Sequence, residues 1–261
     1  MVSYLDYSAS IGESFLHPGG EYYSDILIQE LPLTNSSRVL EIGCGTGATA
    51  VKIAKQKNTS VTAADVSETM LKTAKERAKF NKITSQLTFI HIDNNGLLPF
   101  SDNSFDCIYS ESVLAILSQE VQQTILSEIS RVLVKGGLLI SNDAIWKNDT
   151  TSSEIEKINS TSKKDFDIIQ ATHKPAYLND WLNEFEMKGL TLKKLIPIKS
   201  IKKTYFNNYL DFFKIKKLII AFFDKTKRNE KASIKKKLKL NHKTDYKYLN
   251  NYMFILINNK A

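Results

Sequence analysis

The 261-residue sequence predicts one α/β domain built on a mostly parallel sheet. Short apolar runs alternate with amphipathic segments in the order strand, helix, strand, helix, which is typical of a parallel sheet covered on both faces. A turn with three alternating glycines lies between the first strand and the first helix of this series. The length suits one large domain better than two independent ones, because a single core can still grow at this size.

The first four strands and their helices follow from this alternation. Strands are expected at residues 38–42, 61–64, 87–92 and 105–110, and the first helix at 48–57. Ser67 is expected to cap a second helix, whose apolar residues Met70, Leu71, Ala74 and Ala78 recur at helical spacing. His91 lies in the third expected strand and is predicted to be a buried core histidine.

The second half of the chain continues the pattern and adds three more strands. One helix is expected over residues 121–132, ended by Gly136, and a strand follows at 138–141. Another amphipathic helix at 178–185 is expected to end at Gly189. Strands are then expected at 192–198 and 252–257, which brings the total to seven.

Residues 39–47 indicate function most directly. Gly43, Gly45 and Gly47 let the backbone bend sharply and approach a ligand without a Cβ clash. Glu41 lies near the end of the first strand, and Asp65 ends the second, where a carboxylate can bind both hydroxyls of a ribose. The spacing is Gly-x-Gly-x-Gly, whereas the dinucleotide fingerprint is Gly-x-Gly-x-x-Gly, so a nicotinamide-dependent dehydrogenase is the less favoured interpretation.

These residues and four later motifs, in the same order, resemble the class I S-adenosylmethionine-dependent methyltransferases of the small-molecule branch. The later motifs are Ala63–Leu71, Ile92–Asn94, Leu98–Asp106 and Arg131–Gly137, and the resemblance covers residues 37–145. It implies a Rossmann-like, doubly wound, seven-stranded, mostly parallel sheet with a reversed C-terminal hairpin and helical lid insertions.

The resemblance also implies a cofactor, S-adenosylmethionine, whose product is S-adenosylhomocysteine. By the same resemblance Asp65 binds the ribose, and Asp93 with Asn94 brackets the adenine. The cofactor-binding residues implied in this way are Glu41, Gly43, Gly45, Gly47, Asp65, Val66, Met70, Asp93, Asn94 and Ser110.

The single domain is expected to consist of a cofactor-binding core and additions that cover the substrate. The divisions are an N-terminal lid at 1–34, the core at 35–146, a connection with a helix and the sixth strand at 147–198, a basic lid insertion at 199–249, and the last strand at 250–261. Such additions usually set substrate identity. Tyr4, Tyr7 and Tyr22 are the expected lid residues, and a surface turn followed by a packed helix is the alternative.

The chemistry of methyl transfer makes a catalytic base optional, because holding the acceptor near an activated methyl supplies most of the rate. Glu111 is the first candidate base, since it follows the fourth strand at the edge where ligands bind; an N-capping or solvent-exposed carboxylate is the alternative. For His17 a solvent-facing or capping histidine is favoured over a base. Asp143 is a weaker candidate at the rim. No metal-ligand spacing or hydrolase triad is present, and the two cysteines are expected to be reduced.

Charge is concentrated in one part of the chain. The whole sequence carries +8, but residues 193–247 hold 18 Lys and Arg against 4 Asp and Glu, a balance of +14, so the rest sums to −6. A basic, partly amphipathic insertion fits an anionic substrate, a membrane surface or a structured RNA, and a solvated lid is the plain alternative.

The sequence therefore predicts methyl transfer to a small or amphiphilic metabolite, without identifying the acceptor atom or the oligomeric state. Two alternatives stay open: an RNA methyltransferase that docks through residues 199–247, and a non-catalytic binding domain of the same fold. Peripheral membrane contact is also compatible with the insertion. The chain has no signal sequence and no apolar run long enough to span a bilayer, which predicts a soluble, cytoplasmic protein.

Overall fold

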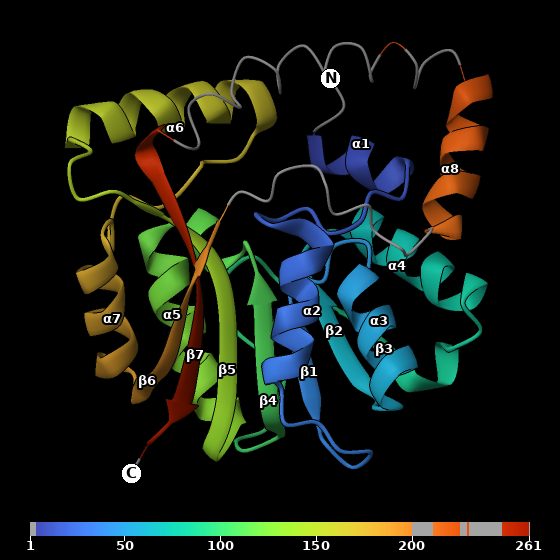
Figure 1. Ribbon diagram of the computed structural model, residues 1–261, viewed down its shortest axis with the longest axis horizontal. Coiled ribbons are helices and arrows are strands. Elements are labelled where there is room, and N and C mark those ends of the chain that lie inside the picture. The colour runs from blue at the N-terminus through green and yellow to red at the C-terminus, as the bar shows by residue number, and fades with distance from the viewer. Residues whose placement is uncertain (1–3, 200–210, 225–228, 230–246, 261) are drawn as a thin grey trace.

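A computed structural model describes residues 4–199, 211–224, 229 and 247–260 (Figure 1). Its centre is a seven-stranded sheet in the order β3-β2-β1-β4-β5-β7-β6. Strands β1 to β5 run parallel to one another, whereas β7 is antiparallel to both β5 and β6. The predicted fold class and reversed C-terminal hairpin are confirmed. The strands are β1 (Val39–Ile42), β2 (Val61–Asp65), β3 (Leu87–His91), β4 (Phe105–Glu111), β5 (Leu133–Trp146), β6 (Leu190–Ile198) and β7 (Leu249–Asn258).

Helices cover both faces of this sheet and bury two separate apolar clusters. Val39 and Leu40, successive residues of β1, belong to different clusters because neighbouring strand residues point to opposite faces. The cluster with Val39 includes residues of α2 and α3, and the one with Leu40 includes residues of α5 and α7. The described helices are α1 (Tyr4–Ser10), α2 (Gly20–Glu30), α3 (Ala48–Lys57), α4 (Glu68–Phe80), α5 (Gln119–Val132), α6 (Ser152–Phe166), α7 (Leu178–Met187) and α8 (Phe212–Phe223).

The added segments gather above one edge of the sheet. The parallel strands end at this edge, and Figure 1 shows α1, α6 and α8 lying over it. Ligands in open α/β sheets bind outside the carboxyl ends of the strands. The additions therefore cover the edge at which a site is expected.

The boundary between α5 and β5 differs from the sequence prediction. The helix ends at Val132 instead of Gly136, and β5 begins at Leu133. β5 is 14 residues long because its ladder with β7 continues from Leu138 to Trp146, well beyond the short apolar run. Gly136 lies inside this strand with φ +78°, so it is a backbone irregularity of β5 and not a helix cap.

His91 is exposed, so the predicted core histidine is wrong. It ends β3, the edge strand of the sheet, and its ring Nε2 lies 3.0 Å from the carbonyl oxygen of Val66. Ser67 does cap α4, since its Oγ accepts a hydrogen bond from the backbone N–H of Met70 at 3.2 Å. None of the helices in the described ranges has the length and apolar character needed to cross a membrane.

Candidate active site

The glycine turn between β1 and α3 contains three glycines with different structural roles. All three have positive φ, from +50° to +72°. A Cβ on Gly43 would lie 2.3 Å from Val113 Cγ2, and one on Gly47 would lie 2.9 Å from the Cβ of Ala74. A Cβ on Gly45 would meet no described atom within 4 Å. Gly43 and Gly47 are therefore required for packing, and Gly45 presents bare backbone to open space.

Asp65, at the end of β2, is tied to this turn. Its Oδ2 accepts a hydrogen bond from the Gly45 N–H at 2.7 Å, and its Oδ1 accepts one from the Ser67 N–H at 2.8 Å. Burial raises the pKa of this carboxyl, and the two backbone donors partly offset that rise. These two hydrogen bonds fix the Asp65 carboxylate beside the glycine turn.

A cavity of about 210 Å³, called here the inner cavity, lies beside these residues. Most of the predicted cofactor-binding residues line it: Gly43, Gly45, Asp65, Val66, Met70, Asp93 and Asn94, together with Glu111. Gly47 is not among its lining residues, because it packs against α4. Ser112 also lines the inner cavity, and its Oγ is buried without a hydrogen-bond partner in the described chain.

A smaller space of about 60 Å³, the glycine-turn pocket, shares Gly43, Gly45 and Glu111 with the inner cavity. Glu41 lines it, and the Oε2 atom of Glu41 is buried with no hydrogen-bond partner among the described residues. Burial, followed by the negative charges of Glu111 and Asp65, raises the pKa of Glu41 well above its ordinary value. The carboxyl groups of Glu41, Asp65 and Glu111 thus lie close together, and such a cluster favours a ligand that carries positive charge.

His17 and Glu111 form a buried pair next to the glycine-turn pocket. His17 Nε2 lies 3.1 Å from Glu111 Oε1, and the two side chains are 4% and 6% exposed. Ser24 Oγ donates to Glu111 Oε1 at 2.8 Å and lies 2.9 Å from His17 Nε2. Thr49 Oγ1 donates to Glu111 Oε2 at 2.6 Å. The solvent-facing interpretations of both residues are therefore wrong, because the N-terminal segment folds back over the end of β4.

The other ring nitrogen of His17 faces Asn142 on β5. Asn142 Nδ2 lies 3.2 Å from His17 Nδ1, and the carbonyl oxygen of Pro18 lies at the same distance from that nitrogen. Asn142 is fully buried, and its Oδ1 has no partner in the part of the chain that the structure describes. Its register explains its position, because Asn142 pairs with Glu111 in the parallel ladder of β4 and β5.

Two predictions on these strands are wrong because of the alternation of the pleat. Ser110, expected at the cofactor, is fully buried and lies 3.2 Å from Ser141 Oγ, away from the described cavities. Asp143, expected at the rim, is fully buried and accepts hydrogen bonds from Ala115 N–H at 3.0 Å and from Ser141. Of their neighbours, Glu111 lines the inner cavity and the glycine-turn pocket, and Asn142 lies against His17. A polar residue at the end of β5 was the available signal, but sequence reasoning selected position 143 instead of 142.

A third and larger space, the outer cavity, has a volume of about 860 Å³ and lies above the sheet edge. Its wall is largely apolar and aromatic, including Tyr4, Tyr7, Phe15, Phe166, Ile168 and Tyr252. Residues 15–17 line both the outer cavity and the glycine-turn pocket, so they form the partition between them. Tyr22, predicted as a lid residue, is 38% exposed and packs edge to face on Tyr23, outside the cavity lining.

Other site chemistries find little support in the described residues. They contain no group of three or more side chains suited to hold a metal ion. Cys44 and Cys107 are both free and buried, and burial raises the pKa of each thiol, to about 11 for Cys107. These cysteines are therefore thiols of low reactivity. Residues 225–228 and 230–246, which carry much of the basic insertion, lie outside the described residues.

Comparisons with known proteins agree with this arrangement. A family model described as a methyltransferase domain matches residues 39–137. An uncharacterized methyltransferase of Bacillus subtilis is 29% identical over 199 residues, which is 76% of this chain and 79% of that protein. The solved structure of the cyclase SpnF superposes with a TM-score of 0.73 at 18% identity, covering 98% of this chain and 93% of its own. Geranyl diphosphate methyltransferase in complex with SAM superposes with a TM-score of 0.65 at 11% identity, covering 92% and 85%.

Proposed function

Because this chain belongs to the class I S-adenosylmethionine-dependent methyltransferases, we propose that it methylates an amphiphilic small molecule held in the outer cavity, with His17 as the base. The proposal is carried by one observation: the buried His17–Glu111 pair lies at the partition between the outer cavity and the glycine-turn pocket. A base at that position can reach an acceptor on one side while the cofactor pocket lies on the other.

The residues of the inner cavity and glycine-turn pocket fit S-adenosylmethionine. When bound, this cofactor supplies a methyl group already activated by a positively charged sulfonium. Glu41, Asp65 and Glu111 supply negative charge around the space for it, and the bare backbone at Gly45 leaves room for close approach. The same carboxylates would repel the diphosphate of a nicotinamide cofactor, which supports methyl transfer over the dehydrogenase alternative.

Each cofactor-facing residue then has a defined task. Asp65 accepts hydrogen bonds from the ribose hydroxyls, as its place at the end of β2 supports. Asp93 and Asn94, which also line the inner cavity, hold the adenine. Glu41 pairs with the amino group of the methionine portion, because it lines the glycine-turn pocket and its buried Oε2 makes no well-formed hydrogen bond within the described residues.

His17 takes the acceptor proton at Nδ1. The single hydroxyl proton of Ser24 is donated to Glu111, so Ser24 Oγ can only accept from His17 Nε2, which places the ring proton on Nε2 and the lone pair on Nδ1. The Asn142 amide, whose Nδ2 lies 3.2 Å from Nδ1, must give way for the acceptor proton to reach this nitrogen. The Glu111 carboxylate then stabilises the charged imidazolium, and Ser24 and Thr49 hold the carboxylate in place. Glu111 is thus a positioning residue, and His17 is the catalytic residue.

The outer cavity supports an acceptor with a sizeable apolar part and an anionic group. Tyr4, Tyr7 and Tyr252 give flat contact surfaces that also carry hydroxyl groups. Lys147 and Lys199 line the same cavity and follow directly after β5 and β6, so both cations lie at the sheet edge. An RNA substrate docked through the basic residues 199–247 is the alternative.

The proposal is tested with methyl-labelled cofactor and fractionated cell extract. Label should pass to small apolar acids extracted into organic solvent, and the RNA fraction should stay unlabelled. His17→Gln should abolish the transfer while S-adenosylhomocysteine still binds, and His173→Ala, which changes an exposed histidine, should leave transfer intact. Label that enters only RNA, or full transfer by the His17 variant, would contradict the proposal.

A further inference from the structure

Helix α8 has an inner face that packs on the N-terminal segment and on α4. Phe213 and Ala221 are buried, at 4% and 8% exposure. Ala221 clusters with Tyr7 and Ile11, and the Phe213 ring packs against Phe80 with centroids 5.8 Å apart. The helix is therefore held by one apolar side.

The lysines of α8 are also drawn toward the protein. Lys214 forms an ion pair with Glu13, and Lys217 Nζ lies 2.5 Å from Glu76 Oε2. Lys216 Nζ lies 5.7 Å from the ring centroid of Phe80. Lys214 and Lys217 are thus held on the inner side by acidic partners, whereas Lys216 is exposed beside Phe80 and is the one described charge of α8 at the spacing of Phe212 and Ile220.

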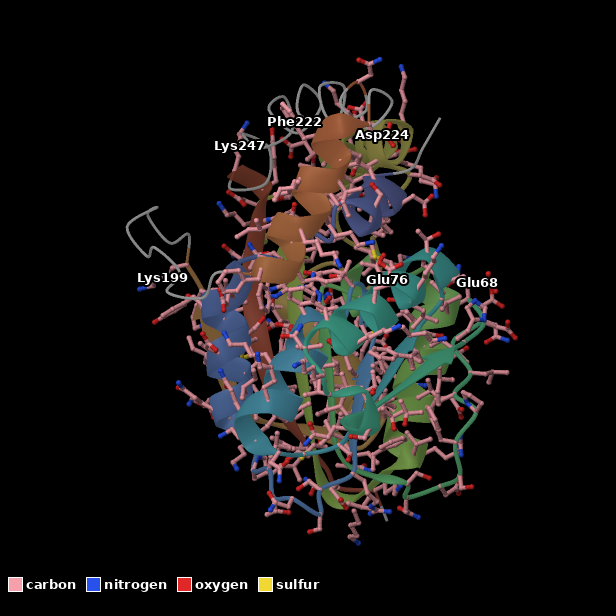
Figure 2. All side chains as sticks on the ribbon, turned by 90° about the vertical axis from the view of Figure 1, so that its right-hand side faces the viewer. Glu68, Glu76, Lys199, Phe222, Asp224 and Lys247 are labelled. Carbon is pink, nitrogen blue, oxygen red and sulfur yellow. The ribbon has the colours of Figure 1, made fainter. Side chains whose placement is uncertain are left out.

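Apart from Lys216, the outward face of α8 is apolar. Phe212, Ile215, Ile219 and Ile220 are 63%, 37%, 57% and 54% exposed. Figure 2 shows the helix standing at the top of the molecule, with Phe222 and Asp224 at the end farthest from the sheet. A helix that packs on a protein in water normally turns its charged residues outward and its apolar residues inward. Isolated exposed apolar residues are common, but a stripe of this kind marks an interaction surface.

We propose that this outer face docks the protein on an anionic lipid surface. The apolar side chains would enter the boundary between headgroups and acyl chains, and the +14 balance of residues 193–247 would be attracted to the headgroup charge. An anionic bilayer would therefore interact both with the exposed apolar side chains of α8 and with the basic residues around it.

Charge also decides against other occupants of this face. A second copy of the chain would bring two +14 segments together across a shared interface, and like charges repel. RNA would satisfy the charge, but its phosphate backbone offers no apolar partner to Phe212 and Ile219. An anionic bilayer is the partner that satisfies both the charge and the exposed stripe.

Docking in this orientation would bring the outer cavity to the membrane. Tyr7 packs against α8 on one side and lines the outer cavity on the other. An amphiphilic acceptor could then pass from the lipid into the cavity. This consequence rests on the proposed function, whereas the docking itself does not.

The docking is tested by flotation of the full-length protein with vesicles of phosphatidylcholine alone or mixed with phosphatidylglycerol. The wild type should float with the anionic vesicles, less so in high salt, and not with the neutral ones. The double variant Phe212→Gln with Ile219→Gln should lose about tenfold or more of the bound fraction, because two large apolar side chains no longer enter the interface. Met187→Gln, which removes a 69% exposed apolar side chain on α7, is the matched control and should float as the wild type does.

Thermal unfolding should confirm that all three proteins are equally folded, since the substituted side chains are exposed. Equal flotation of the double variant and wild type would overturn the proposal, and so would a stripe-dependent dimer with no vesicle binding. Binding to a structured RNA that the double substitution does not change would assign the basic segment to RNA instead. S-adenosylhomocysteine affinity should be the same in every variant, so failure of docking leaves the methyl-transfer proposal intact.

Discussion

Arg77 Nη1 lies 2.6 Å from Asp211 Oδ2, an ion pair that joins α4 to the first turn of α8. The same guanidinium donates from Nε to the carbonyl oxygen of Thr46 in the glycine turn and from Nη2 to that of Gly12, both at 2.9 Å. Asp211 in turn caps α8 by accepting the Lys214 N–H at 3.0 Å. One buried cation therefore connects the glycine turn, the N-terminal segment and the helix proposed to meet the membrane.

Arg77→Met should lower the free energy of unfolding by about 3 kcal/mol, because it leaves the Asp211 carboxylate and two backbone carbonyls without their partner. Denaturant titration followed by circular dichroism measures the loss. Arg38→Met is the control, because Arg38 also forms an ion pair, with Asp106, but its side chain is half exposed. This variant should lower the free energy of unfolding by less than about 1 kcal/mol. Equal losses for the two variants would show that the buried ion pair does not support the fold.

Substitutions in the glycine turn should separate packing from ligand binding. Gly45→Val should abolish S-adenosylhomocysteine binding, because the side chain would fill the open space beside the turn. Gly136→Val is the control, since Gly136 also has positive φ and no described atom within 4 Å of its Cβ position, but lies in β5 outside the cavities. Titration calorimetry should show normal binding for the control, and binding by the Gly45 variant would place the ligand elsewhere.

Gly47→Ala should instead destabilise the fold, because its Cβ would lie 2.9 Å from that of Ala74. The sequence identified the turn correctly but treated its three glycines alike. Which glycine meets a ligand and which meets a helix depends on the packing of α4, and residues distant in sequence decide that packing.

Asp65→Ala should weaken S-adenosylhomocysteine binding by about 2 kcal/mol or more, since charge-assisted hydrogen bonds to the ribose are lost. Isothermal titration gives the affinity, and circular dichroism checks the fold. The control is Asp102→Ala, which removes an exposed carboxylate that pairs with Arg131 far from the cavities. Unchanged affinity of the Asp65 variant would remove Asp65 from the ribose site.

The sequence predicted the seven strands and most of the inner cavity because both depend on local patterns. Gly43, Asp65 and Asp93 each follow or end an apolar strand, and parallel strands bring their ends to one edge. The His17 environment could not be predicted in this way. Ser24, Thr49 and Asn142 come from three separate elements, and only the folded position of the N-terminal segment brings them to Glu111 and His17.

Asp143 should make the protein less stable as pH rises toward neutrality. Burial raises its pKa from the ordinary 3.8 to about 7. The protonated form of Asp143 is thus favoured in the folded state. Its contribution to the free energy of unfolding is complete below about pH 4 and is lost as pH rises through about 7. The free energy of unfolding should fall by up to about 1.4 kcal/mol per pH unit in this window. Asp143→Asn should remove this slope. Urea titrations at several pH values between these limits, compared with wild type, should show the two stability curves converging toward low pH; parallel curves would contradict the assignment.

Asn142→Asp should slow methyl transfer by about a hundredfold or more without changing cofactor affinity, because removal of a general base typically costs that much. Asn142 Nδ2 now lies 3.2 Å from His17 Nδ1, whereas the new carboxylate would accept a proton from that nitrogen and so keep the atom proposed as the base protonated. Asn142 is not among the lining residues of the three spaces, so S-adenosylhomocysteine should bind normally. Asn95→Asp is the matched control, since Asn95 already accepts the Leu97 N–H through its oxygen at an exposed position.

A pH–rate profile distinguishes a positioning role from a loss of packing, because the rising limb should move to higher pH in the Asn142 variant and stay in place in the control. Wild-type turnover with an unmoved limb would show that His17 is not the base.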